Sequence, residues 1–128
     1  MRLLLGTHAV LWYHLGDTQL SRTARALIDD PGNEKLVSAA THWEIAIKVS
    51  TGKYVLHEPF PDFVQHAIHD NKFVIVPILP AHTAIVAGLP FYHRDPFDRL
   101  LVAQAMVEGA PIVTCDPHLV PYPVARLW

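Results

Sequence analysis

The chain has 128 residues, of which 51% are hydrophobic and 17% charged, so we expect a single domain over residues 1–128 with one buried core. Its formal net charge of -2 gives no overall attraction to nucleic acid, so such a partner would need a local basic patch. The single cysteine, Cys115, excludes an internal disulfide and fits a cytoplasmic protein, and no apolar stretch is long enough to cross a membrane.

Short apolar runs alternate with helical patterns along the whole chain. Gly16 and Gly52 each end a helical pattern, and Ser21 is a suitable N-cap for the helix that follows it. In chain order we expect a strand at 3–5, helices at 8–15 and 21–30, a strand at 35–39, helices at 40–52 and 59–71, a strand at 73–78, helices at 80–90 and 96–109, and strands at 111–115 and 124–128. This order predicts an α/β fold with a parallel sheet of about five strands and helices on both faces.

Three acidic residues fall near the carboxyl-terminal edge of this expected sheet. Glu44 lies early in the third helix, Asp98 lies in the first turn of the sixth, and Asp116 directly follows the fourth strand. Each has an ordinary structural explanation: Glu44 can pair with Lys48 one turn later, Asp98 suits a helix start, and Asp116 suits a turn. Their convergence on one edge of the sheet favours a functional site.

Three carboxylates at one place repel one another unless a cation neutralises them or one of them stays protonated. Carboxylate oxygens in a partly open pocket suit Mg²⁺ or Mn²⁺, which keep several waters and also bind a substrate phosphate. The chemistry that this arrangement indicates is metal-assisted phosphodiester hydrolysis.

Four segments then identify a family. LLLGTHAVLW, SAATHWEIAIK, HRDPFDRLLVAQA and IVTCD, in this order and spacing, closely resemble the PIN-domain ribonucleases, and among them the VapC-like toxins of VapBC toxin-antitoxin modules. The resemblance spans essentially the entire chain. It implies a Mg²⁺- or Mn²⁺-dependent endoribonuclease acting on tRNA, ribosomal RNA or mRNA, a VapB-like antitoxin as partner, and a homodimer.

The resemblance also implies the roles of individual residues. By motif position, Glu44, Asp98 and Asp116 are the acidic metal ligands and Asp95 supports them. Thr114 matches a hydroxyl position that orients the site, although a β-branched residue is also ordinary in a strand.

One position departs from the family pattern. The family reads LLLDTH where this chain reads LLLGTH, so Gly6 stands where the first metal-binding aspartate is expected. We therefore expect a fold that survives and a catalytic activity that is weakened or absent. A competing explanation is that glycine is required here for a backbone with positive φ.

Two other functions are possible from the sequence. The chain could be a non-catalytic module that binds RNA or an antitoxin without cutting RNA. It could also be a phosphate-handling α/β domain such as a receiver, but a receiver needs a lysine on a late strand and no lysine follows Lys72.

Two candidate surfaces accompany the site. A phosphate-binding rim could be formed by the basic residues that flank the acidic segments, namely Lys48, Lys53, Arg94 and Arg99. A groove for an antitoxin helix could be formed by apolar residues of the first two helices, namely Leu11, Trp12, Leu15, Leu20, Ala24 and Leu27.

Overall fold

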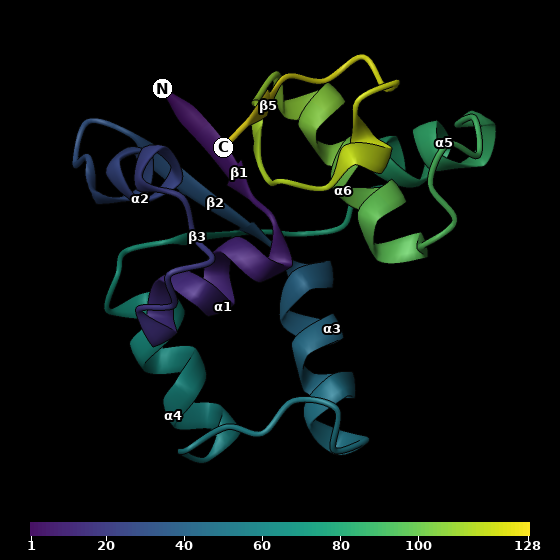
Figure 1. Cartoon of the computed structure of the whole chain (residues 1–128). Helices are drawn as coiled ribbons and strands as arrows, with labels where there is room; N and C mark the ends of the chain where they lie inside the picture. Colours follow the sequence, from purple (N-terminus) through teal and green to yellow (C-terminus); the bar gives the residue numbers. More distant parts are fainter.

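Five short strands form one fully parallel sheet in the computed structural model, which describes residues 1–128 (Figure 1). The strands are β1 (Arg2–Leu5), β2 (Glu34–Ser38), β3 (Val74–Val76), β4 (Ile112–Val113) and β5 (Arg126–Leu127). They lie in the order β3-β2-β1-β4-β5. The predicted α/β fold with about five parallel strands is therefore confirmed.

Helices connect the strands and cover both faces of the sheet. They are α1 (Thr7–Leu15), α2 (Arg22–Asp29), α3 (Ala39–Ser50), α4 (Phe60–Val64) with its π-helical continuation η1 (Gln65–His69), α5 (Pro80–Gly88), α6 (Pro96–Glu108) and the short 3-10 helix η2 (Pro117–Leu119). Every expected helix and strand is present. The last three strands are shorter than expected because only part of each apolar run pairs with a neighbouring strand, and η2 was not predicted.

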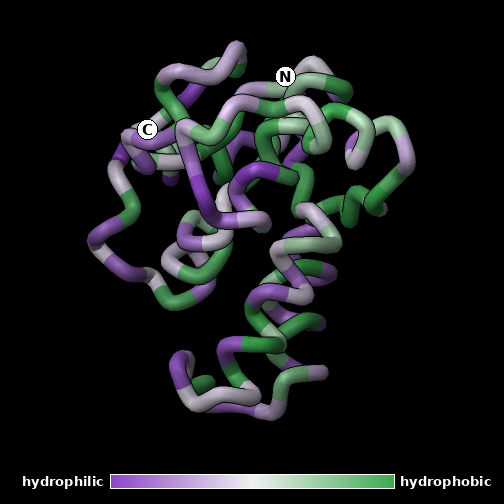
Figure 2. The backbone as a smooth tube through the Cα atoms, turned by 90° about the vertical axis from the view of Figure 1, so that its right-hand side faces the viewer, coloured by the Kyte–Doolittle hydropathy of each residue, from purple (hydrophilic) through white to green (hydrophobic).

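Local signals in the sequence explain where the helices begin and end. The Ser21 hydroxyl accepts a hydrogen bond from the Ala24 amide (3.0 Å), as expected of an N-cap. Gly16 ends α1 in the left-handed conformation, with φ of 65°, which glycine adopts without steric cost. Hydrophobic and hydrophilic residues are interspersed along the helices (Figure 2). In α2 the buried residues, Ala24 and Ile28, are four positions apart and therefore lie on one side of the helix.

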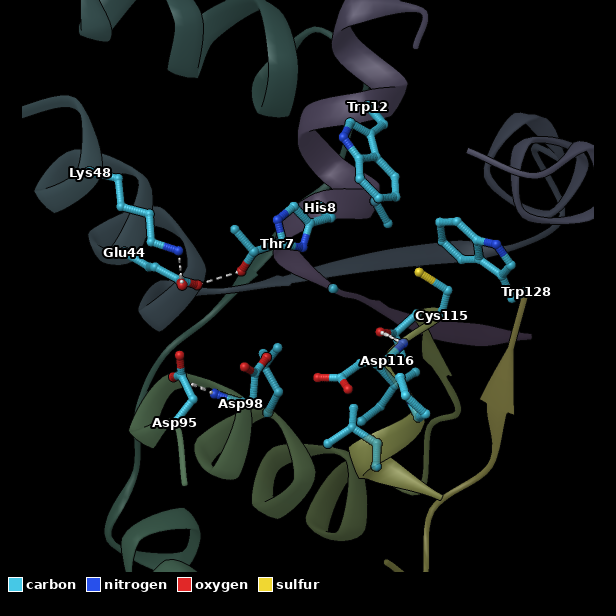
Figure 3. A pocket seen from close by; sticks show the side chains of 17 residues that line it. Thr7, His8, Trp12, Glu44, Lys48, Asp95, Asp98, Cys115, Asp116 and Trp128 are labelled. Carbon is cyan, nitrogen blue, oxygen red and sulfur yellow. Dashed lines mark hydrogen bonds and ion pairs between the residues drawn. The ribbon is translucent and has the colours of Figure 1, made fainter. Parts of the chain in front are cut away.

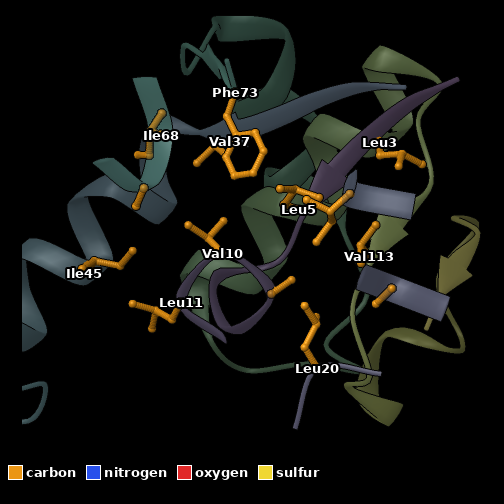
Figure 4. Close-up of a cluster of buried hydrophobic side chains, with 14 of the residues drawn as sticks. Leu3, Leu5, Val10, Leu11, Leu20, Val37, Ile45, Ile68, Phe73 and Val113 are labelled. Carbon is orange, nitrogen blue, oxygen red and sulfur yellow. The ribbon is translucent and has the colours of Figure 1, made fainter. Parts of the chain in front are cut away.

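The core is divided by the sheet because successive side chains of a strand point to opposite faces. Leu3 and Leu5 of β1 pack with α1, α2, α3 and η1 on one face (Figure 4). Leu4 points to the other face and belongs to a second cluster with α6 and η2. The central strand is thus buried on both sides, which fits its unbroken apolar sequence.

The structure removes half of the residues expected to form part of an antitoxin groove on the first two helices. Three of its six residues are buried in the core beneath these helices, namely Leu11, Leu20 and Ala24. Trp12 and Leu27 pack partly against the same core, and only Leu15 is largely exposed. The reason is that α1 and α2 cover the same face of the sheet. Their apolar residues therefore pack into one shared core, which takes more of them than either helix would bury alone.

The strand order reverses beside β1. From β1 the chain proceeds outward to β2 and β3, and then crosses to the other side of β1 to form β4 and β5. In open parallel sheets, ligands bind in the crevice outside the carboxyl ends of the strands where this reversal occurs. The topology therefore places the site between the ends of β1 and β4.

None of the helices could span a membrane, because none is both long enough and apolar enough.

Leu4 offers a direct test of the two-sided core. It is completely buried in the central strand, so we expect Leu4→Ala to lower the free energy of unfolding by about 2–5 kcal/mol. Val74→Ala on the edge strand β3, where the side chain is 45% exposed, should cost less than about 1 kcal/mol. Urea unfolding followed by circular dichroism measures both. Equal losses for the two variants would contradict the core described here.

Candidate active site

A pocket with a volume of about 340 Å³ opens at the strand-order reversal (Figure 3). Its lining includes every residue that the sequence singled out for the site, namely Gly6, Glu44, Asp95, Asp98, Thr114 and Asp116. Gly6 follows β1, Glu44 comes from α3 after β2, and Asp116 follows β4. The parallel topology thus brings together residues that are far apart in the sequence.

Glu44 is buried and both of its carboxylate oxygens are engaged. The Thr7 hydroxyl donates to Oε1 (2.7 Å), and the Lys48 ammonium lies 2.9 Å from Oε2. Burial lowers the pKa of Lys48, but its hydrogen bond and attraction to Glu44 raise that pKa above its ordinary value overall. The pairing of Glu44 with Lys48 that the spacing predicts is therefore present at the wall of the pocket, with Glu44 buried and Lys48 partly exposed.

Asp95 and Asp98 enter the pocket from the start of α6. Asp95 is the N-cap, because its Oδ1 accepts hydrogen bonds from the Phe97 amide (2.8 Å) and the Asp98 amide (3.3 Å). Burial, followed by the negative charge of Asp95, raises the pKa of Asp98 to about 6. The charges of Glu44 and Asp116 act in the same direction, which shows that the acids are crowded.

Asp116 faces Asp98 across the pocket (Figure 3) and has a different electrostatic environment. Burial raises its pKa, but hydrogen bonds from the His118 amide and from the His93 and His118 rings lower that pKa overall. His93 Nε2 lies 2.8 Å from Asp116 Oδ2 and 3.3 Å from Asp98 Oδ2. The sequence reasoning missed His93, although it stands at the start of HRDPFD.

Gly6 has ordinary extended backbone, with φ of -67° and ψ of 160°. The explanation that glycine is required here for a positive φ is therefore wrong. A Cβ at this position would lie 3.5 Å from the Thr114 Cβ and 3.0 Å from the Val113 carbonyl oxygen. A side chain is sterically possible after a shift of a few tenths of an ångström, and it would lie beside the Thr114 hydroxyl in the pocket.

The predicted phosphate-binding rim is mostly wrong. Arg99 is buried, and its guanidinium donates to backbone carbonyls of the segment before α6, chiefly those of Val86, Leu89 and Pro90. Lys48 is bound to Glu44. A buried guanidinium needs several acceptors, and the loop carbonyls supply them. Only Arg94 and Lys53 remain exposed.

Carboxylate oxygens are the donors that a hard divalent cation prefers. Four acids line the pocket, and their mutual repulsion at Asp98 is the kind of strain that a bound cation relieves. Lys48 and His93 partly offset this repulsion, because Lys48 contacts Glu44 and His93 contacts Asp98 and Asp116. The fourth carboxylate expected from the resemblance is absent at Gly6.

Comparison with known proteins finds one family model that covers most of the chain. The PIN domain family matches residues 3–123. Ribonuclease VapC22 of Mycobacterium tuberculosis (strain ATCC 25618 / H37Rv) is 29% identical over 117 residues, which cover 91% of this chain and 88% of the relative.

Solved structures show the same fold. VapBC2 from Rickettsia felis, bound to a DNA fragment from their promoter, aligns over 100% of both chains with a TM-score of 0.66 and 15% identity. FitAB bound to an IR36 DNA fragment aligns over 97% of this chain and 92% of that one, with a TM-score of 0.67 and 18% identity. FitAcB from Neisseria gonorrhoeae aligns over 97% and 95%, with a TM-score of 0.64 and 22% identity.

The raised pKa of Asp98 predicts that the free energy of unfolding depends on pH. Between its ordinary value of 3.8 and about 6, the folded state holds the proton more tightly than the unfolded state, so stability falls as pH rises through this window. After allowance for solvent screening we expect a loss of about 1–2 kcal/mol by pH ~7. Asp98→Asn should therefore stabilise the metal-free chain by that amount at pH ~7 and by little at pH ~4.

Urea unfolding at both pH values measures this difference. Asp62→Asn, which changes an exposed aspartate on α4, is the matched control and should show no such pH-dependent gain. An Asp98→Asn variant that is no more stable than the parent at neutral pH would contradict the crowding described here.

Proposed function

The chain belongs to the PIN domain family, and on that premise we propose that it is a VapC-like toxin with a divalent-metal ribonuclease site that Gly6 leaves incomplete. One observation supports this most strongly: Glu44, Asp98 and Asp116 line a single pocket at the strand-order reversal, and position 6 opens into the same pocket. A related protein carries the name ribonuclease, which supports RNA as the substrate.

Glu44, Asp98 and Asp116 would hold Mg²⁺ or Mn²⁺, with Asp95 supporting Asp98 through the start of α6. A cation bound there supplies Lewis acidity, which lowers the pKa of an attacking water and stabilises the departing oxygen of a phosphodiester. The Thr114 hydroxyl accepts a hydrogen bond from the Asp116 amide (3.2 Å) and so orients the turn that carries this ligand. Exposed Arg94 and Lys53 are the remaining candidates for contacts with RNA phosphates.

A non-catalytic role is the second candidate, and a specific feature favours it. Lys48 already neutralises Glu44, and His93 already bridges Asp98 and Asp116, so the acids are partly compensated without a metal ion. A chain in this state can still bind RNA or an antitoxin. The two candidates differ in whether a restored carboxylate at position 6 brings metal binding and RNA cleavage.

We assign an antitoxin as the protein partner, because the similar structures are named VapBC2, FitAB and FitAcB. An arginine of such a partner would suit the acidic pocket, since a guanidinium can hydrogen-bond to carboxylates with two donors. The exposed free thiol of Cys115 fits action in the reducing cytoplasm.

A homodimer is supported by an apolar surface near the pocket. A cavity of about 320 Å³ is lined by Ala40, Trp43, Ile78, Thr83, Val86, Pro96, Phe97 and Leu100. Trp43 is 60% exposed and packs edge-on against Phe97, with ring centroids 5.4 Å apart. An exposed aromatic surface without charged residues is typical of an interface between protein chains, and we propose a second copy of this chain as its occupant.

Gly6→Asp tests the proposed function. The substitution adds an anionic oxygen to the pocket, so we expect Mn²⁺ affinity to rise at least about tenfold and metal-dependent RNA cleavage to appear. Isothermal titration with Mn²⁺ and cleavage of total RNA measure these effects. Growth arrest on expression should accompany cleavage, whereas the parent chain should be nearly inactive.

Gly6→Ala is the matched control, because it adds the same Cβ beside the Val113 carbonyl without a carboxylate. It should reproduce any change in thermal stability but neither the metal affinity nor the cleavage. A Gly6→Asp protein that folds normally but gains neither property would favour the non-catalytic role and remove position 6 from the site.

The dimer is tested separately with Trp43→Ser. Loss of the exposed indole should convert the dimer to a monomer, measured by light scattering on a size-exclusion column. Val55→Ser, which replaces a side chain that is 79% exposed and lies outside the apolar cavity, should leave the dimer intact. A parent chain that is already monomeric, or a Trp43→Ser variant that stays dimeric, would refute this surface as the interface.

A further inference from the structure

His93 reaches the pocket from the segment that joins α5 to α6, and its ring touches two of the three acids. Nε2 lies 2.8 Å from Asp116 Oδ2 and 3.3 Å from Asp98 Oδ2. The ring is largely enclosed, with 14% of the side chain exposed. One nitrogen atom therefore stands between two carboxylates that otherwise face each other.

The other ring nitrogen determines which hydrogen-bonding role Nε2 has. The backbone amide of Asp95 donates to His93 Nδ1 (3.0 Å), so Nδ1 must present its lone pair. A neutral imidazole with an unprotonated Nδ1 carries its proton on Nε2. His93 is thus a donor to Asp116, with Asp98 Oδ2 in contact at 3.3 Å, and in this form its Nε2 has no lone pair with which to ligate a metal ion.

The backbone of His93 is fixed from two directions. Its amide donates to the Tyr122 hydroxyl (2.9 Å), and the same hydroxyl donates to the Pro90 carbonyl (2.6 Å). Arg99 binds the Pro90 carbonyl (3.0 Å) and approaches the His93 carbonyl (3.5 Å). Tyr122 and Arg99 are both buried, so the ring is delivered to the acids by a rigid support.

From these contacts we propose that His93 is a positioning residue, whose Nε2–H holds the Asp116 carboxylate beside Asp98 in the metal-free chain and orients it toward a divalent cation. Asp98 and Asp116 each present Oδ2 to His93, and the Oδ1 of Asp116 accepts a hydrogen bond from the His118 amide (2.9 Å). Hydrogen bonds of this kind set the direction of metal-ligating carboxylates. The proposal has two halves. The metal half, that His93 orients Asp116 toward a cation, rests on the proposed function. The bridging half, that Nε2–H lies between the acids, concerns the metal-free chain alone.

His118 shows what distinguishes a bridge from a simple contact. Its Nδ1 lies 3.0 Å from Asp116 Oδ1, but the side chain is 68% exposed and it has no contact with Asp98. A histidine that only neutralises Asp116 would act like His118. His93 differs because it links two acids and is held by the fold.

The bridging half is tested by ¹⁵N NMR of the imidazole rings in the metal-free parent chain. We expect His93 to show the neutral form protonated at Nε2. A neutral ring protonated at Nδ1 would overturn the bridge, whatever the metal chemistry. His93→Phe identifies the resonance by its loss, and His93→Gln does so if the phenylalanine variant fails to fold.

The metal half is tested by Mn²⁺ titration in the Gly6→Asp background. His93→Phe should weaken Mn²⁺ binding about 10- to 100-fold. His93→Gln, whose amide N–H can occupy the Nε2 position, should restore most of that affinity, which a purely steric role would not predict. His57→Phe, which changes an exposed histidine outside the pocket, is the control and should change affinity by less than about threefold.

The outcomes separate the two proposals. If Gly6→Asp binds Mn²⁺ and His93→Phe binds it equally well, the positioning role is wrong and the proposed function stands. If no variant binds Mn²⁺, the proposed function and the metal half fail together, and the NMR result alone decides whether His93 Nε2 is a donor toward the acids.

Discussion

The crowding of carboxylates at the reversal of strand order is the constraint on which the rest of the site depends. Glu44, Asp98 and Asp116 are brought to one edge by a parallel topology that cannot place them elsewhere. Their repulsion is visible at Asp98, whose pKa burial and the neighbouring acids raise to about 6. Neighbouring groups offset part of this negative charge. Lys48 forms an ion pair with Glu44, and His93 lies between Asp98 and Asp116.

This compensation also explains why the metal-free chain can hold its shape. Lys48 on Glu44 and the His93 and His118 donors on Asp116 offset part of the desolvation and repulsion that burial imposes. The buried Arg99 takes no direct part, but it ties down the loop that carries His93. Gly6 has ordinary extended backbone, so the fold at this position does not depend on a conformation that only glycine adopts.

Much of the fold and of the pocket's lining could be predicted because the signals are local. Each acid follows or begins an element that the sequence marks clearly, and parallel strands then bring those ends together. Contacts between distant segments could not be predicted in the same way. His93 and Asp116 are 23 residues apart, and nothing in either segment indicates their pairing. Arg99 was misplaced on the surface because its acceptors are backbone carbonyls, which leave no side-chain pattern.

The central claim is that position 6 belongs to a divalent-metal site with Glu44, Asp98 and Asp116. Crystals of the parent chain and of Gly6→Asp, soaked in Mn²⁺ and measured for anomalous scattering, test it most directly. We expect a strong manganese peak in the variant, about 2.1 Å from the introduced carboxylate and from oxygens of the three acids. In the parent we expect a weak peak or none. A peak of equal strength in both crystals, or a variant whose introduced carboxylate points away from the metal, would contradict it.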